Sequence, residues 1–228
     1  MSFKPALVIV DLQEDFCPPN GSLAVQGGRD IVSSINHLLN LPFAVKVATK
    51  DFHPQDHISF ASNHPPPNNK PFESTFTIKN PLNPEETQTT RLWPDHCVQS
   101  TPGSELIPEL NRSKVDHIVE KGQDNRVEMY SAFADPFINP TVSRSKLADI
   151  LKDAKVSDVY VVGLATDYCV KFTALDSAKE GFKTYVVGDA TRPVDPTSLH
   201  DVYKEFASAD VDVISMDSEE IKKMKEYT

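Results

Sequence analysis

Residues 161–182, VVGLATDYCVKFTALDSAKEGF, contain a complete junction from strand through turn to helix, which is the unit of an α/β fold. The apolar beginning of this stretch belongs to a strand over 158–164, and a helix follows the turn. Thr166 or Asp167 is a suitable N-cap, which places Cys169 in the first helical turn. Unpaired N–H groups and the helix dipole stabilise a thiolate there and could hold an oxyanion. The alternative is a cysteine that only fills the core beneath the helix.

The same alternation of apolar runs and helical patterns extends along the chain. We expect helices at 29–40, 145–155 and 198–209, and a charged helix after the last strand. Strands of nearly continuous apolar character imply a parallel sheet covered on both faces. The predicted fold is α/β, a three-layer doubly wound fold with a central six-stranded, mostly parallel sheet. Its ligand site is expected at the carboxyl ends of the strands. The expected strands are 6–12, 43–50, 116–122, 158–164, 183–190 and 211–215.

The length of 228 residues suits a single domain, residues 1–228. Proline is the one compositional departure, with 18 residues, many of them between Pro54 and Pro108. We therefore expect segment 51–112 to be an ordered but irregular insertion in this domain rather than a second domain.

The formal net charge of −10 argues against nucleic acid and anionic membrane as partners. The first apolar run is too short and badly flanked for a signal peptide, and no window approaches the length of a membrane span. Cys17, Cys97 and Cys169 form a sparse, odd set that is typical of reduced thiols. We expect a cytoplasmic protein, with the nucleus not excluded, and its oligomeric state stays open.

Polar residues follow several of the predicted strands. Asp11 is the first polar residue after the first strand, and Lys121 ends the third. Asp11 could be a general base for the thiol of Cys169, and the Lys121 ammonium would lower the pKa of that thiol. Taken singly, Asp11 could equally accept a hydrogen bond in a loop, and Lys121 could be a solvated strand end.

A metal site is indicated by Asp51 and His53, which point the same way on an extended segment. His96, in the proline-stiffened loop WPDHC, supplies a third ligand. Two imidazoles and one carboxylate with open positions are typical of a catalytic metal site, and suit Zn²⁺, Fe²⁺ or Mn²⁺. His57 and His64 are spare candidates, and we leave His57 out of the ligand set.

Three aromatic residues could line a pocket at the same sheet edge. Phe16, Trp93 and Tyr130 are natural walls for a flat aromatic substrate, although each taken singly would also suit the core.

Five segments together resemble the nicotinamidases of the isochorismatase-like cysteine-hydrolase superfamily, with the fungal members as the nearest type. The likeness runs in order from about residue 5 to 195, and the pairing of D-x-H with WPDHC separates nicotinamidases from sister hydrolases. The segments are VIVDLQEDF, KDFHPQDHISFAS, LWPDHCVQSTPGSEL, IVEKG and VVGLATDYCVKFTALDSAKEGF.

The resemblance implies hydrolysis of nicotinamide to nicotinate and ammonia through a cysteine thioester, feeding NAD salvage. It implies a catalytic triad of Asp11, Lys121 and Cys169. It also implies a divalent metal bound by Asp51, His53 and His96. Finally, it implies a cis peptide near Leu164–Ala165, which turns the backbone N–H groups of Ala165 and Cys169 toward the oxyanion. The rivals are a hydrolase of isochorismate or another small amide, and a non-catalytic metal-binding or partner-binding module.

Overall fold

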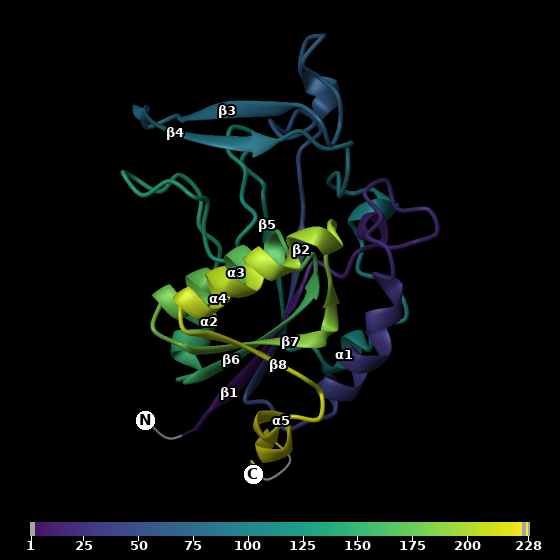
Figure 1. Cartoon of the computed structure of the whole chain (residues 1–228), viewed down its shortest axis with the longest axis vertical. Coiled ribbons are helices and arrows are strands. Elements are labelled where there is room, and N and C mark those ends of the chain that lie inside the picture. The colour runs from purple at the N-terminus through teal and green to yellow at the C-terminus, as the bar shows by residue number, and fades with distance from the viewer. Residues whose placement is uncertain (1–2, 225–226, 228) are drawn as a thin grey trace.

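The computed structural model describes residues 3–224 and 227, and it confirms the predicted α/β fold. Six strands form one parallel sheet in the order β5-β2-β1-β6-β7-β8 (Figure 1). All six lie where the sequence predicts strands. Their bounds are β1 Pro5–Val10, β2 Val45–Asp51, β5 His117–Lys121, β6 Asp158–Leu164, β7 Lys183–Arg192 and β8 Val211–Ile214.

Helices cover both faces of this sheet, because the buried strands have apolar side chains on both sides. In β1, Leu7 and Ile9 pack into one core cluster with α1 and α5, while Ala6, Val8 and Val10 pack into another with α2, α3 and α4. The three layers follow directly from this alternation (Figure 1). The helices are α1 Val32–Leu39, α2 Leu147–Asp153, α3 Cys169–Lys179, α4 Leu199–Ser208 and α5 Glu219–Met224.

The strand order reverses between β1 and β6, which are neighbours at the centre of the sheet. Val10 pairs with Gly163, which has a φ of +110°. A Cβ atom on Gly163 would lie 2.0 Å from the carbonyl oxygen of Val10, so only glycine allows this approach. The close contact brings the residue after β1 beside the turn after β6, at the point where doubly wound folds bind ligands.

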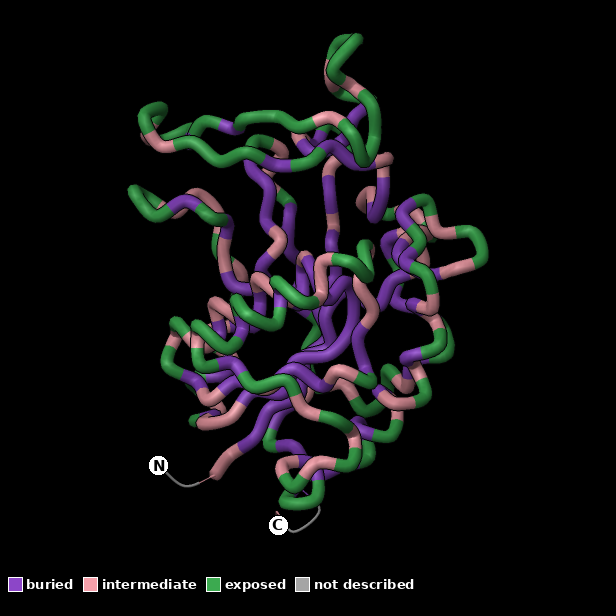
Figure 2. Tube along the Cα trace, viewed as in Figure 1, coloured by how far each residue is buried: buried purple, intermediate pink, exposed green. Residues whose placement is uncertain are grey.

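The segment 51–112, expected to be irregular, contains an antiparallel hairpin of β3 (Thr75–Asn80) and β4 (Asn83–Arg91). This hairpin lies beyond the carboxyl ends of the sheet and is mostly exposed (Figures 1 and 2). Its strands are rich in threonine and charged residues and bury few side chains, so they lack the apolar alternation that identifies a strand from sequence. None of the described helices is both long and apolar enough to cross a bilayer.

Candidate active site

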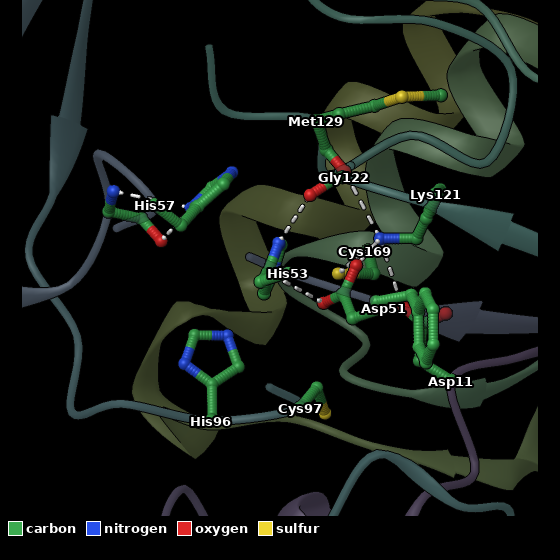
Figure 3. Close-up of polar contacts among 12 residues, drawn as sticks. Asp11, Asp51, His53, His57, His96, Cys97, Lys121, Gly122, Met129 and Cys169 are labelled. Carbon is green, nitrogen blue, oxygen red and sulfur yellow. Dashed lines mark hydrogen bonds and ion pairs between the residues drawn. The ribbon is translucent and has the colours of Figure 1, made fainter. Parts of the chain in front are cut away.

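The residues predicted to act together do meet at the carboxyl edge of the sheet (Figure 3). Asp11 follows β1, Lys121 ends β5, and Cys169 begins α3. The Lys121 Nζ lies 3.0 Å from Asp11 Oδ2 and 3.6 Å from Cys169 Sγ. It also donates to the carbonyl oxygen of Met129 at 3.1 Å. A carboxylate oxygen of Asp11 lies within 4.8 Å of the Cys169 sulfur, so base, cation and thiol form one buried cluster.

Asp11 is held in an uncommon conformation, with a φ of +48°. The Thr49 hydroxyl donates to its Oδ1 at 2.6 Å and accepts from its backbone N–H at 3.2 Å. Apart from the Lys121 ion pair, Oδ2 accepts no hydrogen bond from the described residues and is free to take a proton. Burial raises the pKa of Asp11 to about 6, against the opposing charge of Lys121. Such a carboxylate suits a general base that works near neutral pH.

Cys169 is the first residue of α3, as the sequence predicts, but the capping differs from the prediction. The N-cap is Tyr168, and its side chain makes no capping hydrogen bond. Asp167 does not cap the helix, because its carboxylate accepts hydrogen bonds from the loop after β7.

The pKa of Cys169 favours the neutral thiol rather than the predicted thiolate. Burial raises it well above its ordinary value, although the charge of Lys121 acts to lower it. The thiol is therefore protonated at rest, and attack requires a base.

The turn that precedes Cys169 provides two backbone donors. The Leu164–Ala165 peptide is cis, as the resemblance implies. Among the described residues, no loop carbonyl or side chain accepts the N–H of Ala165 or of Cys169. Both residues line the same small pocket. These two donors could therefore face an oxygen that develops negative charge during attack.

Asp51, His53 and His96 form a possible metal-binding group next to this cluster. One ligand atom from each lies within 4.8 Å of the other two. His53 Nδ1 is 2.8 Å from the Gly122 carbonyl and His96 Nδ1 is 2.7 Å from the Pro94 carbonyl. Because a carbonyl only accepts, both Nδ1 atoms carry hydrogen and both Nε2 atoms are free to bind a metal. This donor set fits Zn²⁺, Fe²⁺ or Mn²⁺.

Electrostatics act differently on the three ligands. Burial alone would lower the pKa of His53, but the charge of Asp51 holds it above its ordinary value. Although burial raises the pKa of Asp51, Lys121 and His53 together hold it below its ordinary value. Burial lowers the pKa of His96 to about 4, so its imidazole is neutral at physiological pH. Asp51 Oδ1 lies 2.5 Å from the Lys121 Nζ, and its Oδ2 lies on the side of His53. One carboxylate thus connects the metal-binding group to the catalytic cluster.

The spare histidines have other partners. His57 stacks on His53 with ring centroids 4.0 Å apart, but its Nδ1 pairs with the Ser59 hydroxyl and it is outside the metal-binding group. His64 donates to the carbonyl oxygen of Ile58. Cys97 and Cys17 are buried and free, and burial raises both pKa values. None of these four residues belongs to the metal-binding group.

The pocket above Cys169 contains all three aromatic residues predicted as walls. The Trp93 indole N–H donates to the Tyr130 hydroxyl at 2.9 Å, and Phe16 lies near the His96 ring. Tyr168 could have been predicted from its place beside Cys169, whereas Val194 lies in a distant loop without any sequence signal. The lining residues missed from sequence are Leu23, Val25, Glu128, Tyr168 and Val194.

A larger cavity of about 310 Å³ lies beside this pocket, between the β3–β4 hairpin and α3. It shares Glu128 and Tyr130 with the pocket, but Cys169 is not among its lining residues. The smaller pocket is therefore the candidate active site.

A doubly wound sheet with a buried Asp–Lys–Cys cluster at its switch point is the arrangement of a cysteine hydrolase. The isochorismatase domain model matches residues 5–218, and the chain belongs to the isochorismatase family. This confirms the resemblance drawn from the five sequence segments.

Several of the similar proteins are nicotinamidases. The nicotinamidase of Acinetobacter baylyi is 40% identical over 211 residues, which cover 92% of each chain. Among solved structures, the yeast nicotinamidase bound to the inhibitor nicotinaldehyde has a TM-score of 0.86 at 36% identity, covering 92% of this chain and 99% of that one. The pyrazinamidase of Pyrococcus horikoshii in complex with zinc has a TM-score of 0.69 at 33% identity, covering 93% and 99%.

Proposed function

We propose that this chain is a nicotinamidase, which hydrolyses nicotinamide to nicotinate and ammonia through a thioester on Cys169. One observation carries the proposal: Cys169, whose sulfur is in contact with Lys121 and close to Asp11, lines an aromatic pocket that also contains the Ala165 donor. The naming of several relatives at 36–40% identity as nicotinamidases supports the substrate.

The first half-reaction transfers the acyl group to the enzyme. Asp11 takes the thiol proton, and the Cys169 sulfur attacks the carboxamide carbon while Lys121 stabilises the developing thiolate. The N–H groups of Ala165 and Cys169 donate to the resulting oxyanion. Asp11 then gives its proton to the amide nitrogen, the C–N bond breaks, and ammonia leaves. The pyridine ring lies among Phe16, Trp93 and Tyr130 throughout.

The second half-reaction reverses these roles. Asp11 removes a proton from water, whose oxygen attacks the thioester carbon. The C–S bond then breaks, the sulfur regains a proton from Asp11, and nicotinate is released. The same carboxylate serves as base and acid twice, which a pKa of about 6 allows near neutral pH.

We assign the metal site to Asp51, His53 and His96, with Zn²⁺ as the first candidate because a similar pyrazinamidase was crystallised with zinc. A bound divalent ion would supply a Lewis acid that orients the substrate ring. Asp51 also holds Lys121 in place, so the ligand set and the catalytic cluster are built together.

The remaining assignments extend the same proposal. Residues 1–228 form one isochorismatase-like domain, and the insertion at 51–112 carries the metal ligands. The product nicotinate feeds NAD salvage. The three free, buried cysteines support a reducing compartment such as the cytoplasm.

The direct test is the release of ammonia from nicotinamide by purified protein supplied with Zn²⁺. We expect stoichiometric ammonia and nicotinate. No ammonia at millimolar nicotinamide would refute the proposed substrate, and isochorismate with other small amides would then be assayed as substrates of the sister hydrolases.

A further inference from the structure

Asp167 connects the nucleophile turn to a wall of the pocket that comes from a different strand. It lies two residues before Cys169 and is buried. Its Oδ1 accepts from the backbone N–H of Val194 at 2.8 Å, and its Oδ2 accepts from that of Asp195 at 2.9 Å. The Ser198 hydroxyl lies 3.3 Å from Oδ2, but its one proton is shared with the Asp195 carbonyl oxygen, which is closer at 2.7 Å. One carboxylate thus receives two backbone hydrogen bonds from the loop that follows β7, with the Ser198 hydroxyl beside it.

These contacts prolong the connection between β6 and β7 beyond the end of the sheet. The last paired residues are Leu164 and Arg192. Past them, the Thr166 N–H donates to the Arg192 carbonyl at 2.9 Å, and Asp167 then accepts from the loop. Without this carboxylate, the loop N–H groups would have no partner in the nucleophile turn, and the loop would be free to separate from it.

The Val194 side chain gives this connection a functional consequence. Val194 lines the catalytic pocket together with Cys169, Ala165 and Tyr168. Ala165, Tyr168 and Cys169 all belong to the turn after β6 and the start of α3, whereas Val194 belongs to the loop after β7. The position of Val194 in the pocket therefore depends on how this loop is held against the turn.

We propose that Asp167 is a positioning residue for substrate binding, which holds Val194 against the pyridine ring and acts through it. This inference rests on the proposed function, because the ring is that of nicotinamide. Asp167 does not touch the reacting atoms. Its removal should therefore weaken binding of the ring and leave the chemistry at Cys169 largely intact.

The key variant is Asp167→Asn, which keeps the size but replaces one acceptor oxygen with an NH₂ group that faces an N–H donor. Loss of one charge-assisted hydrogen bond should raise KM for nicotinamide about tenfold, with kcat within about twofold of wild type. Asp195→Asn is the matched control, because its carboxylate is exposed and bonds Thr197 in its own loop. We expect that control to leave KM unchanged.

A double-mutant cycle with Val194→Ala tests whether Asp167 acts through Val194. We expect each single variant to raise KM, and the double variant to be no worse than the larger single effect. Effects on KM that multiply would overturn the proposal, as would a fall in kcat with KM unchanged. If Asp167→Asn does not fold, Ser198→Ala removes the hydroxyl that contacts both Asp167 Oδ2 and the Asp195 carbonyl, and this weakening of the link should still raise KM about twofold. An unchanged KM there would count against the proposal.

Binding can also be read without turnover. Trp93 is the only tryptophan and lines the pocket, so its fluorescence reports nicotinamide binding in a Cys169→Ala background. Asp167→Asn should raise this dissociation constant by the same factor as KM, and an unchanged constant would overturn the proposal.

Failure of the proposed function can be distinguished from failure of this inference, because in the first case wild-type protein would release no ammonia from nicotinamide. Failure of this inference requires an active wild type and an Asp167→Asn variant that matches Asp195→Asn.

Discussion

The Nζ of Lys121 lies 3.0 Å from the Oδ2 of Asp11, and both side chains are fully buried. The same ammonium lies against Asp51 and the sulfur of Cys169, so one positive charge stabilises two carboxylates and also favours the thiolate. Lysine is therefore both the structural centre of the cluster and the group that makes thiol ionisation accessible.

Replacing Lys121 with Met should impair both stability and catalysis. Two buried carboxylates would lose their counterion, which typically costs about 3–5 kcal/mol of unfolding free energy. The kcat should fall by about 100-fold or more, because the thiolate loses its cation. Urea unfolding and ammonia release measure the two effects. A variant with wild-type kcat would remove Lys121 from the mechanism.

The pKa of Asp11 should set the acidic limb of the pH profile. The base must be unprotonated to accept the thiol proton, and burial raises its pKa from 3.8 to about 6. The value of kcat/KM should therefore fall as pH drops through about 6, whereas an ordinary aspartate would remain active down to about pH 4.

Thr49→Val provides the matched test of that assignment. The Thr49 hydroxyl bonds the Asp11 carboxylate and lowers its pKa, so its loss should move the acidic limb to higher pH. A limb that moves to lower pH, or that does not move, would show that another group controls it.

Loss of a metal ligand should separate metal content from folding. His96→Ala removes one of the three ligands, so the purified protein should lose bound metal and show a raised KM for nicotinamide. His57→Asn is the control, since His57 stacks on His53 but lies outside the ligand group. Elemental analysis compares the two variants. A His96→Ala variant with the metal content of wild type would exclude His96 as a ligand.

The close approach at Gly163 predicts a stability effect independent of catalysis. Gly163→Ala places a Cβ atom 2.0 Å from the Val10 carbonyl oxygen and should destabilise the fold by about 3 kcal/mol or more. Gly181→Ala is the matched control, with a similar positive φ of +94° but nothing within 4 Å of the added atom. Its cost should be about 1 kcal/mol, measured by denaturant unfolding. Equal losses would contradict the packing argument.

The sequence predicts this edge of the sheet well, because strands such as β1 are apolar throughout and the residues after them are abruptly polar. Asp11, Asp51 and Lys121 could be identified in this way without knowledge of their contacts. The β3–β4 hairpin could not, since it packs few side chains and shows no apolar period. Lys121 does act to lower the pKa of Cys169, but burial raises that pKa by more, and the extent of burial cannot be read from a helix N-terminus.

Contacts between distant segments could not be predicted either, because they depend on packing that a local sequence pattern does not show. Asp167 reads as an N-cap from its local pattern, yet its carboxylate accepts from Val194 and Asp195, nearly thirty residues away. Only the pairing of β6 with β7 brings these groups together.

The role of Cys169 as nucleophile is tested by the rate of ammonia release from nicotinamide by Cys169→Ala, compared with wild type under the same metal loading. The thiol is the only atom group removed, so folding and metal content should be unchanged. We predict a loss of turnover of about 10⁴-fold or more, as expected when a nucleophile is removed. Measurable turnover at a rate near that of wild type would contradict the central claim that Cys169 attacks the carboxamide.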